Sequence, residues 1–228
     1  MSSEIYILSR SNHSYVSLLH KFLKKMGREC YIVVDESPLV NNKDILYYNT
    51  EYIVRDNFCY LHWLPRVIAW DKVFYHLSKV GVDKDFYYFM EDDVFCNKLS
   101  VFNDLFNKMD EDVDTDLIAA SVKDYYQLRR WNHWNFGRED FEDKHLSKSL
   151  NCLCRLSRRL VQDILEFQRE HQKFIFFEVL FACICKKNMY NTKDFLVDND
   201  LKDYFYKFVF KDLASSGKYV NNYKEVFD

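Results

Sequence analysis

Glycine and proline are scarce in this chain. Its 228 residues contain 4 glycines and 2 prolines, where average usage would give about 16 and about 11. The glycines stand at positions 27, 81, 137 and 217, too far apart to form a G-x-G-x-x-G turn or a G-x-x-x-x-G-K-[ST] loop. Any nucleotide that this protein binds must therefore be held without a glycine-rich cradle.

A large excess of one charge is also absent. The 32 Lys and Arg residues against 35 Asp and Glu residues give a formal net charge of −3. Nucleic-acid binding needs a concentrated basic surface, so we expect no nucleic-acid partner. Hydrophobic residues make up 48% of the chain, which excludes low-complexity disorder and is enough for a sizeable core. The length fits one domain.

Long hydrophobic runs are missing as well. The richest stretch, residues 174–185, contains Glu178 and falls short of the roughly 18 apolar residues that a membrane span needs. The first ten residues, MSSEIYILSR, lack the basic start and apolar stretch of a signal peptide. We therefore expect a soluble, cytoplasmic protein without a membrane span.

The seven cysteines form no C-x-x-C pair. Two C-x-C pairs, Cys152/Cys154 and Cys183/Cys185, could together make a four-thiolate zinc site, although zinc knuckles usually space their ligands more widely. We favour the alternative that the cysteines are reduced and mostly buried, because a free cysteine packs like a small hydrophobic residue.

Hydrophobic periodicity predicts alternating strands and helices. The predicted strands are residues 4–8, 30–34, 52–54, 86–90, 117–121 and 150–156. The predicted helices are residues 16–26, 65–80, 99–109, 158–170 and 176–187, with a polar, aromatic-rich loop at 123–144. The opening strand, helix and strand form a βαβ unit, which implies a parallel sheet.

The sharpest motif is FYYFMEDDVF, residues 86–95, in which a predicted strand runs into Glu91, Asp92 and Asp93. In an extended chain Glu91 and Asp93 share a face, and Asp92 points the other way. Ligand sites of open α/β sheets lie at the carboxyl ends of strands, and burying several carboxylates there is costly without a cation. The motif therefore favours a site for Mg²⁺ or Mn²⁺. The alternative is a solvated acidic loop.

A second carboxylate of interest, Glu178, stands alone in the apolar run KFIFFEVLFACIC. Burial would raise its pKa toward neutrality, which suits a general base that takes a proton from an acceptor hydroxyl. The alternative is that Glu178 caps a helix or pairs with an arginine.

Three segments in order, AWDKVFYHL, FYYFMEDDVF and FFEVLFACIC, resemble nucleotide-sugar glycosyltransferases of the GT-A fold. The longer combination also resembles the small glycosyltransferases encoded by large algal DNA viruses (chlorovirus type) and their relatives. The resemblance covers roughly residues 1–190, and it departs from the family pattern at Glu91, where the motif has Asp. It implies an α/β, Rossmann-like GT-A domain with a mixed, mostly parallel central sheet flanked by helices. Residues 1–121 would form the nucleotide-sugar-binding lobe and residues 122–228 the acceptor-side lobe.

The resemblance also implies roles for individual residues. The donor pocket would be lined by Ser9, Arg10, Asp35, Asp71, Glu91 and Asp92. Asp35 would accept hydrogen bonds from the base, and Asp71 would contact the ribose or the donor sugar. Asp93 would hold Mn²⁺ or Mg²⁺, assisted by Glu91 or Asp92. For Arg10 the alternative is a surface charge, and for Asp71 a pairing with Lys72 on a solvated face.

Trp131, His133 and Trp134 lie in the loop that would face the acceptor. Aromatic faces stack on sugar rings, so these residues are candidate acceptor contacts, and His133 is also a possible third metal ligand. The alternative is the ordinary packing of a long loop.

The sequence therefore predicts a metal-dependent transferase that moves a sugar from a nucleoside diphosphate sugar, UDP by preference, to a hydroxyl of a glycan or glycoprotein. With Glu178 as base the reaction inverts the anomeric centre. The alternatives are a metal-dependent hydrolase of phosphoesters or glycosides and a non-catalytic nucleotide- or sugar-binding module. Residues 112–116, DVDTD, resemble a phosphatase nucleophile motif but fail at Asp116, so we interpret them as a solvated turn. If the chain is viral, the compartment is the host cytoplasm.

Overall fold

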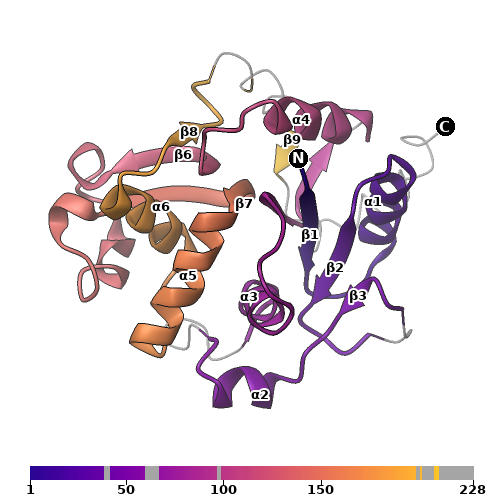
Figure 1. The fold of residues 1–228 in the computed structure, drawn as a ribbon, viewed down its shortest axis with the longest axis horizontal. Coiled ribbons are helices and arrows are strands. Elements are labelled where there is room, and N and C mark those ends of the chain that lie inside the picture. The colour runs from indigo at the N-terminus through magenta and orange to yellow at the C-terminus, as the bar shows by residue number, and fades with distance from the viewer. Residues whose placement is uncertain (39–41, 60–66, 97–98, 199–200, 202–207, 211–228) are drawn as a thin grey trace.

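A seven-stranded sheet forms the centre of the molecule in the computed structural model, which describes residues 1–38, 42–59, 67–96, 99–198, 201 and 208–210 (Figure 1). The strand order is β3-β2-β1-β4-β7-β6-β8. Its strands are β1 (Ser3–Ser9), β2 (Cys30–Val34), β3 (Ile45–Leu46), β4 (Phe86–Glu91), β6 (Leu117–Asp124), β7 (Ser147–Ser157) and β8 (Thr192–Asp194). A separate antiparallel pair joins β5 (Val94–Cys96) to β9 (Phe208–Phe210).

The sheet is mixed but mostly parallel, as the sequence predicts. β1 pairs in parallel with both β2 and β4, and β2 pairs in parallel with β3. β7 is antiparallel to its two neighbours, β4 and β6, while β6 and β8 are parallel. Within this sheet β7 alone runs against the other strands. The predicted boundary between residues 121 and 122 falls inside β6, so both predicted lobes contribute to one continuous sheet.

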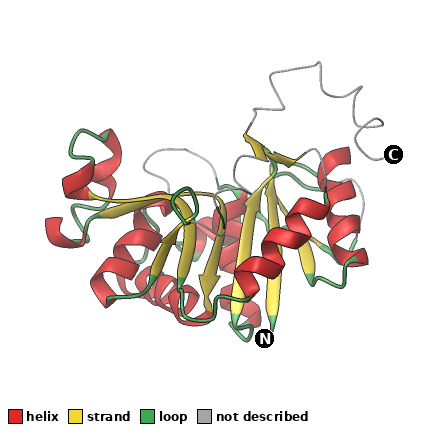
Figure 2. Ribbon diagram, turned by 90° about the horizontal axis from the view of Figure 1, so that it is seen from above, coloured by secondary structure: helices red, strands yellow, loops and turns green. Residues whose placement is uncertain are grey.

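Helices cover both faces of the sheet (Figures 1 and 2). The helices are α1 (Ser14–Lys25), α2 (Thr50–Arg55), α3 (Ala69–Val80), α4 (Ser100–Asp110), α5 (Arg158–His171) and α6 (Phe177–Asn188). The apolar sides of α1 and α4 share one core with Ile5 and Ile7 of β1. Those of α3, α5 and α6 share the other core with Tyr6 and Leu8. The alternation along β1 follows from the two-residue period of a strand and sends each neighbour to the opposite layer.

Most predicted elements are confirmed, but the strand predicted at residues 52–54 is wrong. These residues lie in α2, where the side chain of Asn49 accepts a hydrogen bond from the backbone N–H of Glu51 at 2.9 Å. Tyr52, Ile53 and Val54 have the composition of a strand, yet Ile53 is the buried residue of the helix and its neighbours are exposed. The N-cap and the burial of Ile53 in the core outweigh the strand propensity.

The helix predicted from residue 65 begins at Ala69, and Pro65 lies outside the described residues. The helix ends as predicted, with Gly81 at its C-cap and a φ of 91° that favours glycine. The predicted loop at residues 123–144 contains the end of β6 and three short 3₁₀ turns, η1 (Tyr125–Gln127), η2 (Asn132–Phe136) and η3 (Asp143–His145).

The solvated turn predicted at residues 112–116 is wrong for Asp116. This residue is 2% exposed, and its carboxylate accepts two hydrogen bonds from Arg159 and one from the hydroxyl of Ser157. Asp116 thus ties the start of β6 to the start of α5.

The four cysteines of the C-x-C pairs are buried free thiols, as the alternative interpretation predicts. The structure does not bring the two C-x-C pairs together as a four-thiolate site, and no cluster of three metal-ligating side chains is found among the described residues. None of the helices in the described part of the chain has the length and apolar character that a membrane crossing requires.

Candidate functional site

A cavity of about 170 Å³ lies at the carboxyl ends of β1, β2 and β4, beside the first turn of α3. The lining residues are Leu8, Ser9, Arg10, Asp35, Ile68, Ala69, Trp70, Glu91, Asp92 and Asp93. The chain leaves β1 through α1 on one face of the sheet and enters β4 from α3 on the other. Ligands of open α/β sheets bind where the connections diverge in this way.

The parallel register explains why residues far apart in the sequence meet here. Ser9 pairs with Val34 of β2, and Leu8 pairs with Glu91 of β4. The residues that follow each strand therefore reach the same edge. With the exception of Asp71, the cavity contains every residue that the sequence predicts for the donor pocket, together with Asp93.

Asp92 links β1 to the turn after β4. The hydroxyl of Ser9 donates a hydrogen bond to its Oδ2 at 2.5 Å, and Nε2 of His13 lies 3.2 Å from the same oxygen. Burial raises the pKa of Asp92, but the hydrogen bonds from His13 and Ser9 outweigh it and hold the pKa below its usual value. Asp92 is therefore an ionised carboxylate that fixes the strand ends.

The expected alternation of Glu91, Asp92 and Asp93 does not hold. β4 ends at Glu91, and the two aspartates form a turn before β5, so all three residues line the cavity. Burial, together with the charges of nearby Asp93 and Glu178, raises the pKa of Glu91 to about 7, against the opposing effect of a hydrogen bond from Trp70. Carboxylates held this close together repel one another when ionised, and a cation bound between them would relieve that repulsion.

Glu178 lies in the first turn of α6, half-buried, and interacts electrostatically with Glu91. Burial raises its pKa, and Lys148 of β7 opposes that rise. Asn151 fixes the start of the helix by donating a side-chain hydrogen bond to the carbonyl of Phe177 at 2.9 Å. Within the described residues the cationic group that acts on Glu178 is Lys148, not an arginine, and the N-cap of the helix is Phe176, so neither alternative role is seen.

Asp71 does not line the cavity. It is 1% exposed, and its Oδ2 accepts a hydrogen bond from the backbone N–H of Ile68 at 2.9 Å, which holds the start of α3. Its role as a ribose or sugar contact stays a prediction. The alternative in which Asp71 and Lys72 share a solvated face is wrong, because the first two turns of α3 are buried all round.

Lys72 is a residue that the sequence argument missed. Its side chain is 0% exposed, and its ammonium donates hydrogen bonds to the carbonyls of Val34, at 3.1 Å, and Asp35, at 2.5 Å. The sequence does contain a signal for this burial: Ala69 and Tyr75, three positions before and after Lys72, place apolar or aromatic residues on the same side of the helix.

Arg10 lies at the rim of the cavity. Its side chain is 70% exposed and forms a surface ion pair with Glu36, in which Nε donates to Oε1 at 2.6 Å. The position is compatible with both the pocket and the surface-charge interpretations.

The aromatic loop divides into packing and candidate contact residues. Trp134 is 2% exposed and donates its indole N–H to the carbonyl of Leu128 at 2.7 Å, so the packing alternative applies to it. Trp131 and His133 are half-buried and lie against Phe176, immediately before α6. Lys148, the cation that acts on Glu178, lies 5.0 Å from the centre of the Trp131 ring.

The residues present fit a hard divalent cation, although no three metal-ligating side chains cluster in the described part of the chain. Mg²⁺ and Mn²⁺ are usually held by one or two carboxylates together with substrate phosphates. Asp93 and Glu91 can supply two carboxylates in one cavity. His133 finds no support as a third ligand in this geometry.

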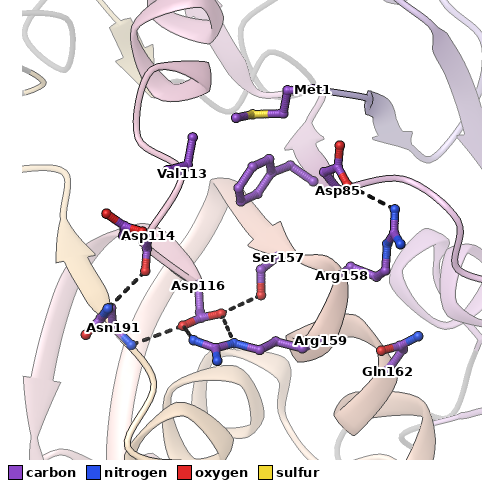
Figure 3. Close-up of a pocket in the computed structure, with 11 residues that line it drawn as sticks. Met1, Asp85, Val113, Asp114, Asp116, Ser157, Arg158, Arg159, Gln162 and Asn191 are labelled. Carbon is purple, nitrogen blue, oxygen red and sulfur yellow. Dashed lines mark hydrogen bonds and ion pairs between the residues drawn. The ribbon is translucent and has the colours of Figure 1, made fainter.

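A larger cavity, of about 920 Å³, lies at the opposite ends of the central strands, near the start of β4 and the end of β7 (Figure 3). Four of its charged side chains form two ion pairs: Arg159 pairs with Asp116, and Arg158 pairs with Asp85. It contains none of the predicted site residues, so we assign the chemistry to the smaller cavity.

A comparison with protein-family models and with curated proteins finds no match to this sequence. Functional inference therefore depends on the chemistry of the cavity and of the residues around it.

Proposed function

We propose that this chain is a metal-dependent glycosyltransferase of the GT-A type, which moves a sugar from a nucleoside diphosphate sugar to a glycan hydroxyl. The observation that carries the proposal is the meeting of Ser9, Asp35 and the acids of residues 91–93 in one cavity, with Glu178 acting on Glu91 from α6. We favour a UDP-sugar as donor, and the cytoplasm, of a host cell if the chain is viral, as the place of reaction.

On the donor side, Asp35 is the acceptor that we assign to the base, and Ser9 and Asp92 fix the strand ends beneath the diphosphate. Asp93 is the residue that we expect to hold Mn²⁺ or Mg²⁺, with Glu91 assisting. Such an ion, when bound, neutralises the charge of the diphosphate leaving group. This arrangement replaces the glycine-rich cradle that the sequence lacks.

On the acceptor side, Glu178 takes the proton of the attacking hydroxyl. The hydroxyl oxygen forms a bond to the anomeric carbon, the bond from that carbon to the phosphate oxygen breaks, and the nucleoside diphosphate leaves with the electron pair. A single displacement inverts the anomeric centre. Burial raises the pKa of Glu178, which brings its basicity closer to that required at neutral pH.

Titration calorimetry with UDP and with GDP, each with and without Mn²⁺, tests the proposal. We expect binding that depends on the metal and that is lost in Asp93→Ala. The matched control is Asp104→Ala, which removes an exposed aspartate from α4. Absence of nucleoside diphosphate binding would contradict the proposal. Release of free sugar from the donor without an acceptor would favour the hydrolase, and binding without turnover would favour the non-catalytic module.

A further inference from the structure

Lys72 is completely buried, and its ammonium binds the backbone of Asp35, a residue that lines the proposed donor cavity. Lysine is almost never fully buried unless its charge is paired. Here the ammonium donates hydrogen bonds to the carbonyls of Val34 and Asp35 and lies 4.2 Å from the centre of the Tyr47 ring. Carbonyl dipoles and an aromatic face compensate the lost hydration.

Both carbonyls belong to the carboxyl end of β2, where Asp35 lines the cavity. The same segment is joined to β1, since the N–H of Asp35 donates to the carbonyl of Ser9 at 3.1 Å and that of Glu36 donates to the carbonyl of Arg10 at 3.0 Å. Lys72 adds a third attachment, from α3. Asp35 is thus held from β1 on one side and from α3 on the other.

Burial disfavours the charged form of Lys72. Burial lowers the pKa of Lys72 to about 8, and the charges of Asp35 and Asp71 oppose this change. A methionine of similar length would fill the space between α3 and β2 without this penalty, but it would not bind the two carbonyls. The lysine is therefore better explained by what it holds than by the space it fills.

We propose that Lys72 is a positioning residue for the donor pocket, which fixes the end of β2 so that Asp35 forms the cavity wall where the base of the nucleotide is read. This inference rests on the proposed function. Lys72 affects donor affinity through Asp35 and does not itself contact the donor.

The test compares wild type, Lys72→Met, Asp35→Asn and the double variant by titration with UDP in the presence of Mn²⁺. The matched control is Lys79→Met, which removes an exposed lysine from the same helix. We expect a loss of about tenfold or more in affinity for Lys72→Met, as for a lost hydrogen bond to a charged group, and no change for the control. The double variant should bind no more weakly than Asp35→Asn, because both substitutions lower UDP affinity through the same side chain, that of Asp35.

Hydrogen exchange provides a readout that needs no ligand. The amides of Asp35 and Glu36 should exchange faster in Lys72→Met, and Lys72→Arg should restore part of their protection. If Lys72→Met does not fold, Lys72→Gln, which keeps a donor without the charge, takes its place. Unchanged amide exchange, or additive losses in the double variant, would overturn the inference. If wild type binds no nucleoside diphosphate while the amides respond as expected, the proposed function fails and the anchoring of β2 stands.

Discussion

The indole N–H of Trp70 donates a hydrogen bond to Oε1 of Glu91 at 2.7 Å, which joins the first turn of α3 to the end of β4. The same indole ring stacks on Phe177, with ring centres 5.5 Å apart, beside Glu178 in α6. One side chain therefore connects the acid that we place on the donor side with the acid that we place on the acceptor side. Trp70 is the physical link between the two halves of the candidate site.

Trp70→Phe should weaken metal-dependent UDP binding, because it removes the hydrogen bond to Glu91 while the aromatic packing remains. We expect a loss of about 1–3 kcal/mol in the free energy of unfolding from the unsatisfied carboxylate. Trp134→Phe is the matched control, since it removes an indole hydrogen bond to a carbonyl away from the cavity. Titration calorimetry and urea denaturation measure both effects, and equal weakening of UDP binding in the two variants would contradict this role.

Glu178→Gln should reduce sugar transfer by about 10²–10⁴-fold, the usual contribution of a general base, and leave the affinity for the donor nucleotide unchanged. The measurement is the rate of transfer at saturating donor together with the Kd of UDP. Glu170→Gln, on the exposed surface of α5, is the control. Full activity in Glu178→Gln would remove Glu178 from the mechanism.

The ion pair between Asp116 and Arg159 should contribute stability that depends on pH. Burial raises the pKa of Asp116, but the hydrogen bonds from Arg159 and Ser157 outweigh it, so the pKa lies below 3.8 in the folded protein. A carboxyl with a depressed pKa stabilises the fold above its unfolded pKa and loses that contribution as the pH falls through its folded pKa. The stability of wild type relative to Asp116→Asn should therefore be constant from pH 7 to about pH 5 and decrease below about pH 4. Urea midpoints across this range measure the difference, and a constant difference down to pH 2 would refute the prediction.

Lys72 should produce a pH dependence in the alkaline range. Its pKa falls from 10.5 to about 8 on folding, so the unfolded chain binds more protons between these values. Stability contributed by this group must therefore increase as the pH rises through that window. Wild type should gain on the order of 3 kcal/mol relative to Lys72→Met between pH 8 and pH 10.5, by the free energy per pKa unit. Denaturant unfolding of both proteins at several pH values measures the gain.

Much of the fold could be predicted because its central strands are buried on both faces. The apolar runs at residues 4–8, 30–34 and 86–90 favour buried strands, and the helix between the first two fixes a parallel pair. The meeting of Ser9, Asp35 and residues 91–93 in one cavity could be predicted for a related reason: parallel strands end at one edge, so polar residues after each strand must meet there.

The rest depends on contacts that no local pattern contains. Asp116 stands in an acidic stretch typical of a surface turn, and it is buried because Arg159 reaches it from α5. Lys72 has the charge of a surface residue, but the carbonyls that bind it lie in β2, almost forty positions earlier. Residues 52–54 have strand propensity, yet an N-cap at Asn49 starts a helix there. In each case a partner distant in sequence or a capping side chain determines the burial or the secondary structure of the residue.

The reversed strand β7 has a consequence for dissection of the protein. Because β7 fills the place between β4 and β6, a fragment that stopped before residue 147 would leave β4 without its neighbour on that side. An unpaired strand of sequence FYYFME would then present open backbone groups and large aromatic side chains, which is the usual template for aggregation. Residues 1–121 are therefore unsuited to expression as an independent module, and the cavity at the ends of β1, β2 and β4 is obtained in native form only together with the strand that closes the sheet beside it.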